Sequence, residues 1–150
     1  MKRSLFDPAA AAEIVNRFGQ LNPASTARWG KMQVTEMLLH CTLANTFIVE
    51  DRSPYQMQGL KKRLLTFAAI HLIPRFPHNR KGPGRLHTIG KIDQDEFEQQ
   101  RKTCIKSITR FANYKEPITS LHGGLGFLSN REWGIITWMH MDHHLRQFGI

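Results

Sequence analysis

Three histidines lie on predicted helices where they could bind one metal ion. His140 and His144 are four residues apart in the last predicted helix, so their rings share one face and lie one turn from each other. At this spacing a helix offers two imidazoles to a single ion. His40 lies in the middle of another predicted helix, beside the helical stripe of Leu39, Leu43 and Phe47, where solvation alone does not explain a histidine. We therefore predict a metal site formed by His40, His140 and His144.

Such a site would have three imidazole ligands and open coordination positions. Open positions for water or substrate are typical of a reactive metal site, whereas a closed four-ligand site is structural. Imidazole suits borderline divalent ions, of which zinc and nickel are the expected ones. The ion would lower the pKa of bound water, or hold a thiolate, for attack on an electrophile. The alternative is that all three are ordinary hydrogen-bonded histidines, because His-x-x-x-His pairs also arise by chance.

Three neighbours of these histidines have weaker claims to a role. His143 lies about 100° around the helix from His144, which predicts a side chain that faces outward or supports a ligand from behind. Cys41 points about 100° away from His40 and is predicted to be a packed core thiol. Glu36, one turn before His40, either orients the second ring nitrogen of that histidine or is an ordinary surface glutamate, and the sequence favours neither.

Capping signals mark the first and last helices that must position these residues. Asp7 and Pro8 form an N-cap followed by a first helical residue. Ser129 and Glu132 have the spacing of a capping box, and Gly149 supplies a stop for the helix that follows. Both histidines of the His-x-x-x-His pair therefore belong to a well-delimited helix.

The whole chain is predicted to be helical apart from its loops. The predicted helices span residues 9–18, 29 or 32 to 50, 58–73, 93 to about 111, and 129–149. No strand is convincing, and Tyr114–Phe127 is predicted to be loop. The sequence therefore predicts an all-α fold, a four-helix bundle with an extra short helix and a long basic loop over Arg75–Gly90. The chain is predicted to be a single domain spanning residues 1–150.

Composition and cysteine usage predict a soluble protein of the cytoplasm. The chain has 41% hydrophobic and 22% charged residues, which are globular values. Cys41 and Cys104 are far apart in the sequence and form no CxxC motif, which argues against a zinc ribbon or a disulfide scaffold and for a reducing compartment. The longest apolar-rich run, Leu64–Ile73, is about half of the ~20 residues needed to cross a bilayer. We expect no membrane partner.

The formal net charge of +9 admits two interpretations. A basic rim could attract a small acidic thiol or another acidic substrate; its members would be Lys61, Lys62, Arg80, Lys81 and Arg85. Nucleic-acid binding is a second possibility, based on the same charge, but the chain lacks interleaved aromatic residues and a recognisable reading helix. A third is a non-catalytic helical bundle that only dimerises.

Short motifs in two predicted helices resemble a known superfamily. Trp29-Gly30-Lys31-Met32 precedes Glu36-Met37-Leu38-Leu39-His40-Cys41, and Glu132-Trp133-Gly134 precedes His140-x-x-His143-His144-Leu145-Arg146-Gln147-Phe148-Gly149. Together these motifs resemble the DinB/YfiT-like superfamily, in a branch that is catalogued as a domain of unknown function. The resemblance covers nearly the whole chain, and the last motif is its most specific part.

The resemblance implies both a fold and a metal triad. The fold is a four-helix bundle of up-down-down-up order, often dimeric, so we expect a homodimer. The triad takes one histidine from the second helix and a His-x-x-x-His pair from the last, which match His40, His140 and His144. Characterised members include thiol-dependent transferases and isomerases, and others are described as metal-dependent hydrolases. The implied function is a metal-dependent enzyme of thiol-transferase or hydrolase type that acts on a small molecule, with a low-molecular-weight thiol as one candidate.

One motif departs from the pattern of this superfamily. Relatives carry His-Pro-x-Phe-Gly before the last helix, whereas this chain has His122-Gly123-Gly124-Leu125-Gly126. The histidine and the final glycine match, but the proline and the phenylalanine do not. We therefore expect a more flexible loop around His122 and assign no role in the site to that residue.

Overall fold

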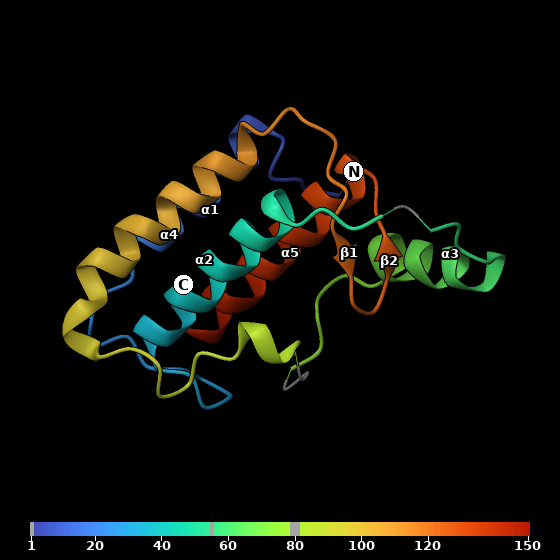
Figure 1. The fold of residues 1–150 in the computed structure, drawn as a ribbon. Coiled ribbons are helices and arrows are strands. Elements are labelled where there is room, and N and C mark those ends of the chain that lie inside the picture. The colour runs from blue at the N-terminus through green and yellow to red at the C-terminus, as the bar shows by residue number, and fades with distance from the viewer. Residues whose placement is uncertain (1, 55, 79–81) are drawn as a thin grey trace.

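The fold was analysed in a computed structural model that describes residues 2–54, 56–78 and 82–150. Within these residues the protein is mostly helical, as the sequence predicts (Figure 1). The helical elements are, in chain order, α1 (Pro8–Gly19), α2 (Val34–Glu50), α3 (Leu60–Phe67), the π-helical turn η1 (Ala68–Leu72), the 3-10 turns η2 (Gly84–Leu86) and η3 (Gln94–Glu96), α4 (Phe97–Ala112) and α5 (Asn130–Gln147). None of the helices in the described ranges is long and apolar enough to cross a membrane.

The first and last helices begin where their capping residues predict. Asp7 Oδ1 accepts a hydrogen bond from the backbone N–H of Ala9 at 2.9 Å, and Pro8 is the first helical residue. At the start of α5, Ser129 Oγ accepts from the N–H of Glu132 at 3.3 Å, while the N–H of Ser129 donates to Glu132 Oε2 at 2.7 Å. These bonds satisfy N–H groups that have no partner inside the helix, and so they fix the register of α5.

The predicted starts of two other helices are corrected by the structure. Helix α2 begins at Val34, after an N-cap at Gln33, rather than at Trp29 or Met32. The side chain of Glu36 closes this start, because its Oε2 accepts from the N–H of Gln33 at 2.7 Å. The predicted helix from residue 93 begins instead with the 3-10 turn η3, which lacks a side-chain cap, and the α-helical part starts after it.

Four long helices contribute to one hydrophobic core. Helix α2 packs against α4 and α5, and α1 packs against the same two helices. Large side chains that are fully buried come from each of them, including Phe18, Met37, Leu38, Ile108, Phe111, Met141 and Leu145. Burial of these apolar side chains is the main force that holds the helices together. The packing brings the middle of α2 against the second half of α5, where the three histidines lie.

The two cysteines are separated in the sequence but neighbours in this core. Both Cys41 on α2 and Cys104 on α4 are fully buried and free of disulfides. Burial raises the pKa of the Cys41 thiol well above its usual range, and the adjacent Cys104 raises it further. The thiol of Cys41 is therefore protonated and packed, as predicted, and does not face the histidines as a ligand.

A small antiparallel hairpin lies in the segment predicted to be loop. Strands β1 (Leu121–His122) and β2 (Gly126–Phe127) pair in the register Leu121↔Phe127 and His122↔Gly126. The Nδ1 atom of His122 accepts from the N–H groups of Gly124 at 3.1 Å and Leu125 at 3.0 Å, which closes the turn. The expectation of no strand is therefore wrong here. Strands of two residues are too short to produce an alternating pattern of hydrophobicity.

The segment before α1 crosses α5 at Gly134. The N–H of Leu5 donates to the carbonyl oxygen of Gly134 at 3.0 Å. A Cβ atom at Gly134 would come within 2.6 Å of Phe6 Cδ2 and closer still to Ser4 Oγ. The side chains of Ser4 and Phe6 therefore occupy the space that a Cβ atom would need, which favours glycine at this point of the helix.

Replacing Gly134 with alanine should lower the free energy of unfolding by about 1–3 kcal/mol, because the added methyl group overpacks this crossing. The destabilisation by overpacking should exceed the stabilisation of about 1 kcal/mol that alanine gains over glycine from its higher helix propensity. Urea denaturation of both proteins would measure it. Gly19→Ala is the control, since a Cβ atom there meets nothing within 4 Å. Equal stabilities for the two variants would contradict the prediction.

Candidate metal centre

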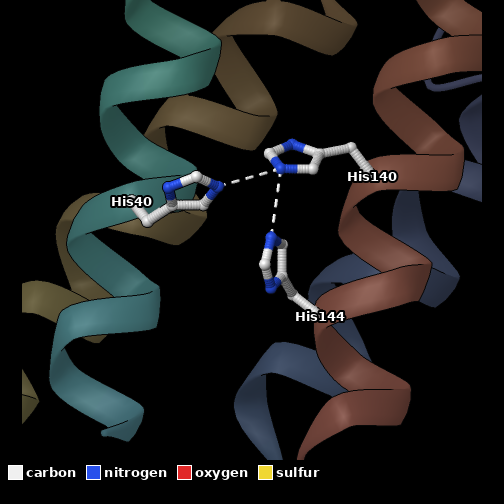
Figure 2. Close-up of side chains that lie close together, drawn as sticks. All are labelled: His40, His140 and His144. Atoms are coloured by element: carbon white, nitrogen blue, oxygen red, sulfur yellow. Dashed lines mark hydrogen bonds between the residues drawn. The ribbon is translucent and has the colours of Figure 1, made fainter. Parts of the chain in front are cut away.

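The structure brings together the three histidines singled out in the sequence. His40 comes from α2, and His140 and His144 come from α5, with all three rings pointing toward one another (Figure 2). His140 Nε2 lies 3.0 Å from His40 Nε2 and 3.1 Å from His144 Nε2. The three possible ligand nitrogens all lie within 4.8 Å of one another, so one ion could contact all of them.

Contacts on the far side of two rings determine which nitrogens carry hydrogen. His40 Nδ1 lies 2.7 Å from the carbonyl oxygen of Leu86, which can only accept, so Nδ1 is the donor. His144 Nδ1 lies 2.9 Å from Gln147 Oε1. The amide of Gln147 is oriented by its Nε2, which donates to the carbonyl oxygen of Trp29 at 2.7 Å. In the neutral form, the Nε2 atoms of His40 and His144 therefore both carry lone pairs.

The resulting arrangement fits a metal ion better than a hydrogen-bonded network. Two lone pairs point at His140 Nε2, which has at most one hydrogen to donate. A cation among the three nitrogens would satisfy all of them. Two nitrogens that are each 2.0–2.1 Å from zinc, at tetrahedral to octahedral angles, lie about 2.9–3.4 Å apart, and the two distances from His140 Nε2, 3.0 and 3.1 Å, fall in this range. Carbonyl acceptors behind Nδ1 are also usual for histidines that bind metals.

The electrostatics of the site keep the three rings neutral. Burial lowers the pKa of His144 to about 3, and the neighbouring His40 contributes to this shift. Burial also lowers the pKa of His140 well below its usual range, with His144 and His40 as further causes. The pKa of His40 is lowered by burial, although its bond to Leu86 opposes the shift. Neutral imidazole is the form that binds metals, so the triad is ready to do so at pH 7.

Glu36 has neither of the two roles that the sequence allowed. Its side chain is buried, and its Oε1 accepts from the N–H of Gly90 at 2.6 Å. Its carbonyl oxygen accepts from Thr88 Oγ1 at 2.8 Å. Both bonds hold the end of the long basic loop against α2, and the same loop carries Leu86, the partner of His40. Glu36 therefore supports His40 indirectly, through the position of this loop.

His143 lies beside the triad without pointing into it. Its half-buried ring is 5.2 Å from the ring of His144 and 5.8 Å from that of Trp29, measured between ring centroids. The ring of Trp29 is stacked on His78 at 3.9 Å. Burial lowers the pKa of His143, and the charge of Arg146 contributes. His143 thus belongs to an aromatic group behind His144, in agreement with its predicted supporting position.

One described member of the predicted basic rim precedes, in the sequence, a residue that contacts the triad. The guanidinium of Arg85 lies 3.5 Å from the ring centroid of Phe47 on α2, and Arg85 directly precedes Leu86. Lys61 and Lys62 are exposed on α3, and the structure shows no contact between them and the triad residues. The other two members, Arg80 and Lys81, lie outside the described residues. Arg85 is therefore linked to the triad through its chain neighbour Leu86, whose carbonyl oxygen contacts His40.

Comparison with known families covers nearly the whole chain. A family model described as a protein of unknown function, DUF1569, matches residues 2–149. The chain belongs to the DUF1569 family. All three histidines of the candidate site lie within the matched region. No curated protein and no solved structure matches the chain. Membership in DUF1569 supplies no activity, so the function must be inferred from the residues of the site.

Gln147 is a functional candidate that reasoning from the sequence did not single out. Replacing it with alanine should weaken zinc binding about 10- to 100-fold, because His144 loses the acceptor that fixes its ring and its hydrogen. Titration against a chromophoric chelator would measure this. Gln99, exposed on α4, provides a matched control for the same substitution. If Gln147→Ala and Gln99→Ala bind zinc equally well, the supporting role of Gln147 is rejected.

Proposed function

We propose that this DUF1569 protein binds a divalent metal ion through His40, His140 and His144. The proposal extends to enzymatic activity of thiol-transferase or hydrolase type on a small molecule. The observation that carries it is the convergence of two lone pairs on a third imidazole, with the Nδ1 atoms of His40 and His144 already engaged by acceptors. Hydrogen bonding within the protein leaves this arrangement incompletely satisfied, whereas a cation completes it.

The chain itself contributes orientation, protonation state and charge. Leu86 and Gln147 hold two of the imidazoles with their Nε2 atoms directed inward, and burial keeps the rings neutral. Zinc or nickel, held by three imidazoles, would supply Lewis-acid activation of water or a thiol. Arg85 would attract an acidic substrate toward the site. The four-residue spacing on α5 keeps His140 and His144 on one face of a rigid element.

Further parts of the proposal rest on the resemblance to the DinB/YfiT-like superfamily. They are the up-down-down-up order of the four long helices and a homodimer. The proposed cytoplasmic location rests instead on the two unpaired cysteines. The resemblance supports the same three histidines that the geometry favours. It also favours two reaction types, transfer involving a small thiol and hydrolysis. A shared fold does not, however, transfer a substrate from one protein to another.

Elemental analysis of protein purified without an affinity tag tests the proposal. We expect about one zinc or nickel ion per chain, because three neutral imidazoles form a complete tridentate site. Ester hydrolysis and transfer of a small thiol to an electrophile should then be assayed before and after chelation. Activity should vanish with the chelator and return with the metal. Failure to take up either metal would reject the site, whereas metal uptake without turnover would reject only the enzyme.

A further inference from the structure

The entire excess of positive charge lies in one segment of the chain. No acidic residue occurs between Asp51 and Asp93, and residues 52–92 contain nine Lys and Arg residues. The other twelve Lys and Arg residues are balanced by the twelve Asp and Glu residues of the chain. The formal charge of +9 is therefore a local property of this segment. Segregated charge of this kind indicates a surface that meets an anionic partner.

The same segment exposes most of the large apolar side chains found at the protein surface. Among the described residues, nine large hydrophobic side chains are exposed, and eight of them lie in 52–92. Five belong to α3 and η1: Leu60, Leu64, Leu65, Phe67 and Leu72, which are 56–75% exposed. An apolar patch of this kind on a soluble domain usually marks an interaction site. These exposed apolar side chains are therefore a second feature, after the charge, that indicates an interaction surface.

Helix α3 and turn η1 bury few of their side chains against the rest of the protein. Thr66 and Ile70 are their buried residues, and Thr66 Oγ1 donates to the carbonyl oxygen of Leu125 at 2.9 Å. The leucines and the phenylalanine of these two elements are exposed. Lys61, Lys62 and Arg63 follow one another in the first turn of α3 and are also exposed. Exposed apolar and basic side chains thus lie together on α3 and η1.

This combination is typical of a helix that lies in the interfacial layer of an anionic membrane. There, Leu and Phe enter the boundary of the acyl chains while Lys and Arg contact the charged headgroups. The long stems of Lys61 and Lys62 allow their ammonium groups to reach the headgroups while the helix lies flat. An eight-residue α-helix followed by a π-helical turn is far too short to span a bilayer, so the contact would be peripheral.

We propose that the exposed side chains of α3 and η1 dock the protein on an anionic lipid surface. The proposal differs from the expectation of no membrane partner, and it is independent of the metal site. A second copy of the chain could cover the same leucines, but it would bring together two segments that carry all the excess positive charge and no acidic residue. A nucleic-acid partner would account for the positive charge of this segment, but it would not account for the exposed leucines and Phe67.

Vesicle flotation tests this proposal on the full chain. Vesicles of phosphatidylglycerol and phosphatidylcholine in equal amounts should bind the protein at low salt, and vesicles of phosphatidylcholine alone should not. Lys61→Gln/Lys62→Gln should weaken partitioning about 25-fold, since each charge near the surface contributes about fivefold. Leu64→Ser/Leu65→Ser should weaken it about tenfold. Lys102→Gln/Lys106→Gln removes the same charge from α4, on the opposite side of Figure 1 from α3, and should change nothing.

Three results would overturn the proposal. The first is no flotation with the anionic vesicles. The second is a loss of flotation in the lysine variant with none in the leucine variant, since this would indicate charge attraction alone, as for nucleic acid. The third is a dimer in light scattering that dissociates in the leucine variant, which would assign the surface to a second copy. Circular dichroism and metal content, measured for each variant, show that the fold and the histidine site are intact.

Discussion

Replacing His144 with alanine should weaken zinc or nickel binding at least about 100-fold, which exceeds the effect expected for loss of a group that merely supports a ligand. The substitution removes one of three nitrogens and leaves the pair His40 and His140, which sit on different helices. Two imidazoles leave most of the coordination shell to water. Elemental analysis and titration against a competing chelator would measure the loss of metal.

A histidine outside the cluster provides the control for this variant. His87 is exposed and its side chain lies outside the group that could hold an ion. His87→Ala should retain metal as the unaltered protein does. At a metal concentration of 100 times the dissociation constant, the unaltered protein should also gain about 2.7 kcal/mol of stability, and His144→Ala should not. Unchanged metal content in His144→Ala would remove the basis of the proposed function.

The metal-free protein should lose stability steeply as the pH falls below 6.5. In the unfolded chain a histidine binds its proton near pH 6.5, whereas in the folded protein burial and the neighbouring His40 hold the pKa of His144 at about 3. Below pH 6.5 the unfolded chain therefore binds more protons, and the folded state becomes less stable. His144 alone should remove about 4 kcal/mol by pH 3. His140, whose pKa is also lowered, acts in the same direction.

Urea denaturation of chelator-treated protein at several pH values would measure this slope. Above pH 6.5 these histidines should contribute no pH dependence to the free energy of unfolding. Between pH 6.5 and pH 3 the free energy of unfolding should fall. His144→Gln removes one of the titrating groups, so its stability should depend less on pH over the same range. His87→Gln, at an exposed histidine outside the cluster, is the matched substitution for comparison. A slope that is identical in His144→Gln and in the unaltered protein would show that His144 is not held neutral by the fold.

The parts of this fold that could be predicted from the sequence depend on local signals. Asp7 and Ser129 bond to backbone groups two or three residues away, so their positions alone locate the starts of α1 and α5. The pair His140 and His144 is local in the same sense. His40 required a further inference, that a histidine beside an apolar stripe faces the interior, and the structure confirms its place beside the pair.

The parts that could not be predicted depend on contacts between distant segments. The acceptor for His40 is a backbone carbonyl, which every residue has, so no residue type points to Leu86. Glu36 is buried by a loop more than fifty residues farther along the chain. Cys41 and Cys104 meet only because α2 packs against α4. Residue types and spacing within one helix do not predict such contacts between distant segments.

The contact between His40 and the loop also restricts how this family can vary. A main-chain oxygen is present whichever side chain occupies position 86, so the residue type there is free to change. The path of the chain is not free, because the carbonyl must stay within reach of the imidazole while Gly90 stays within reach of Glu36. Insertions or deletions between these two anchor points should therefore be rarer among relatives than substitutions, and the length of this stretch should identify members that retain the site.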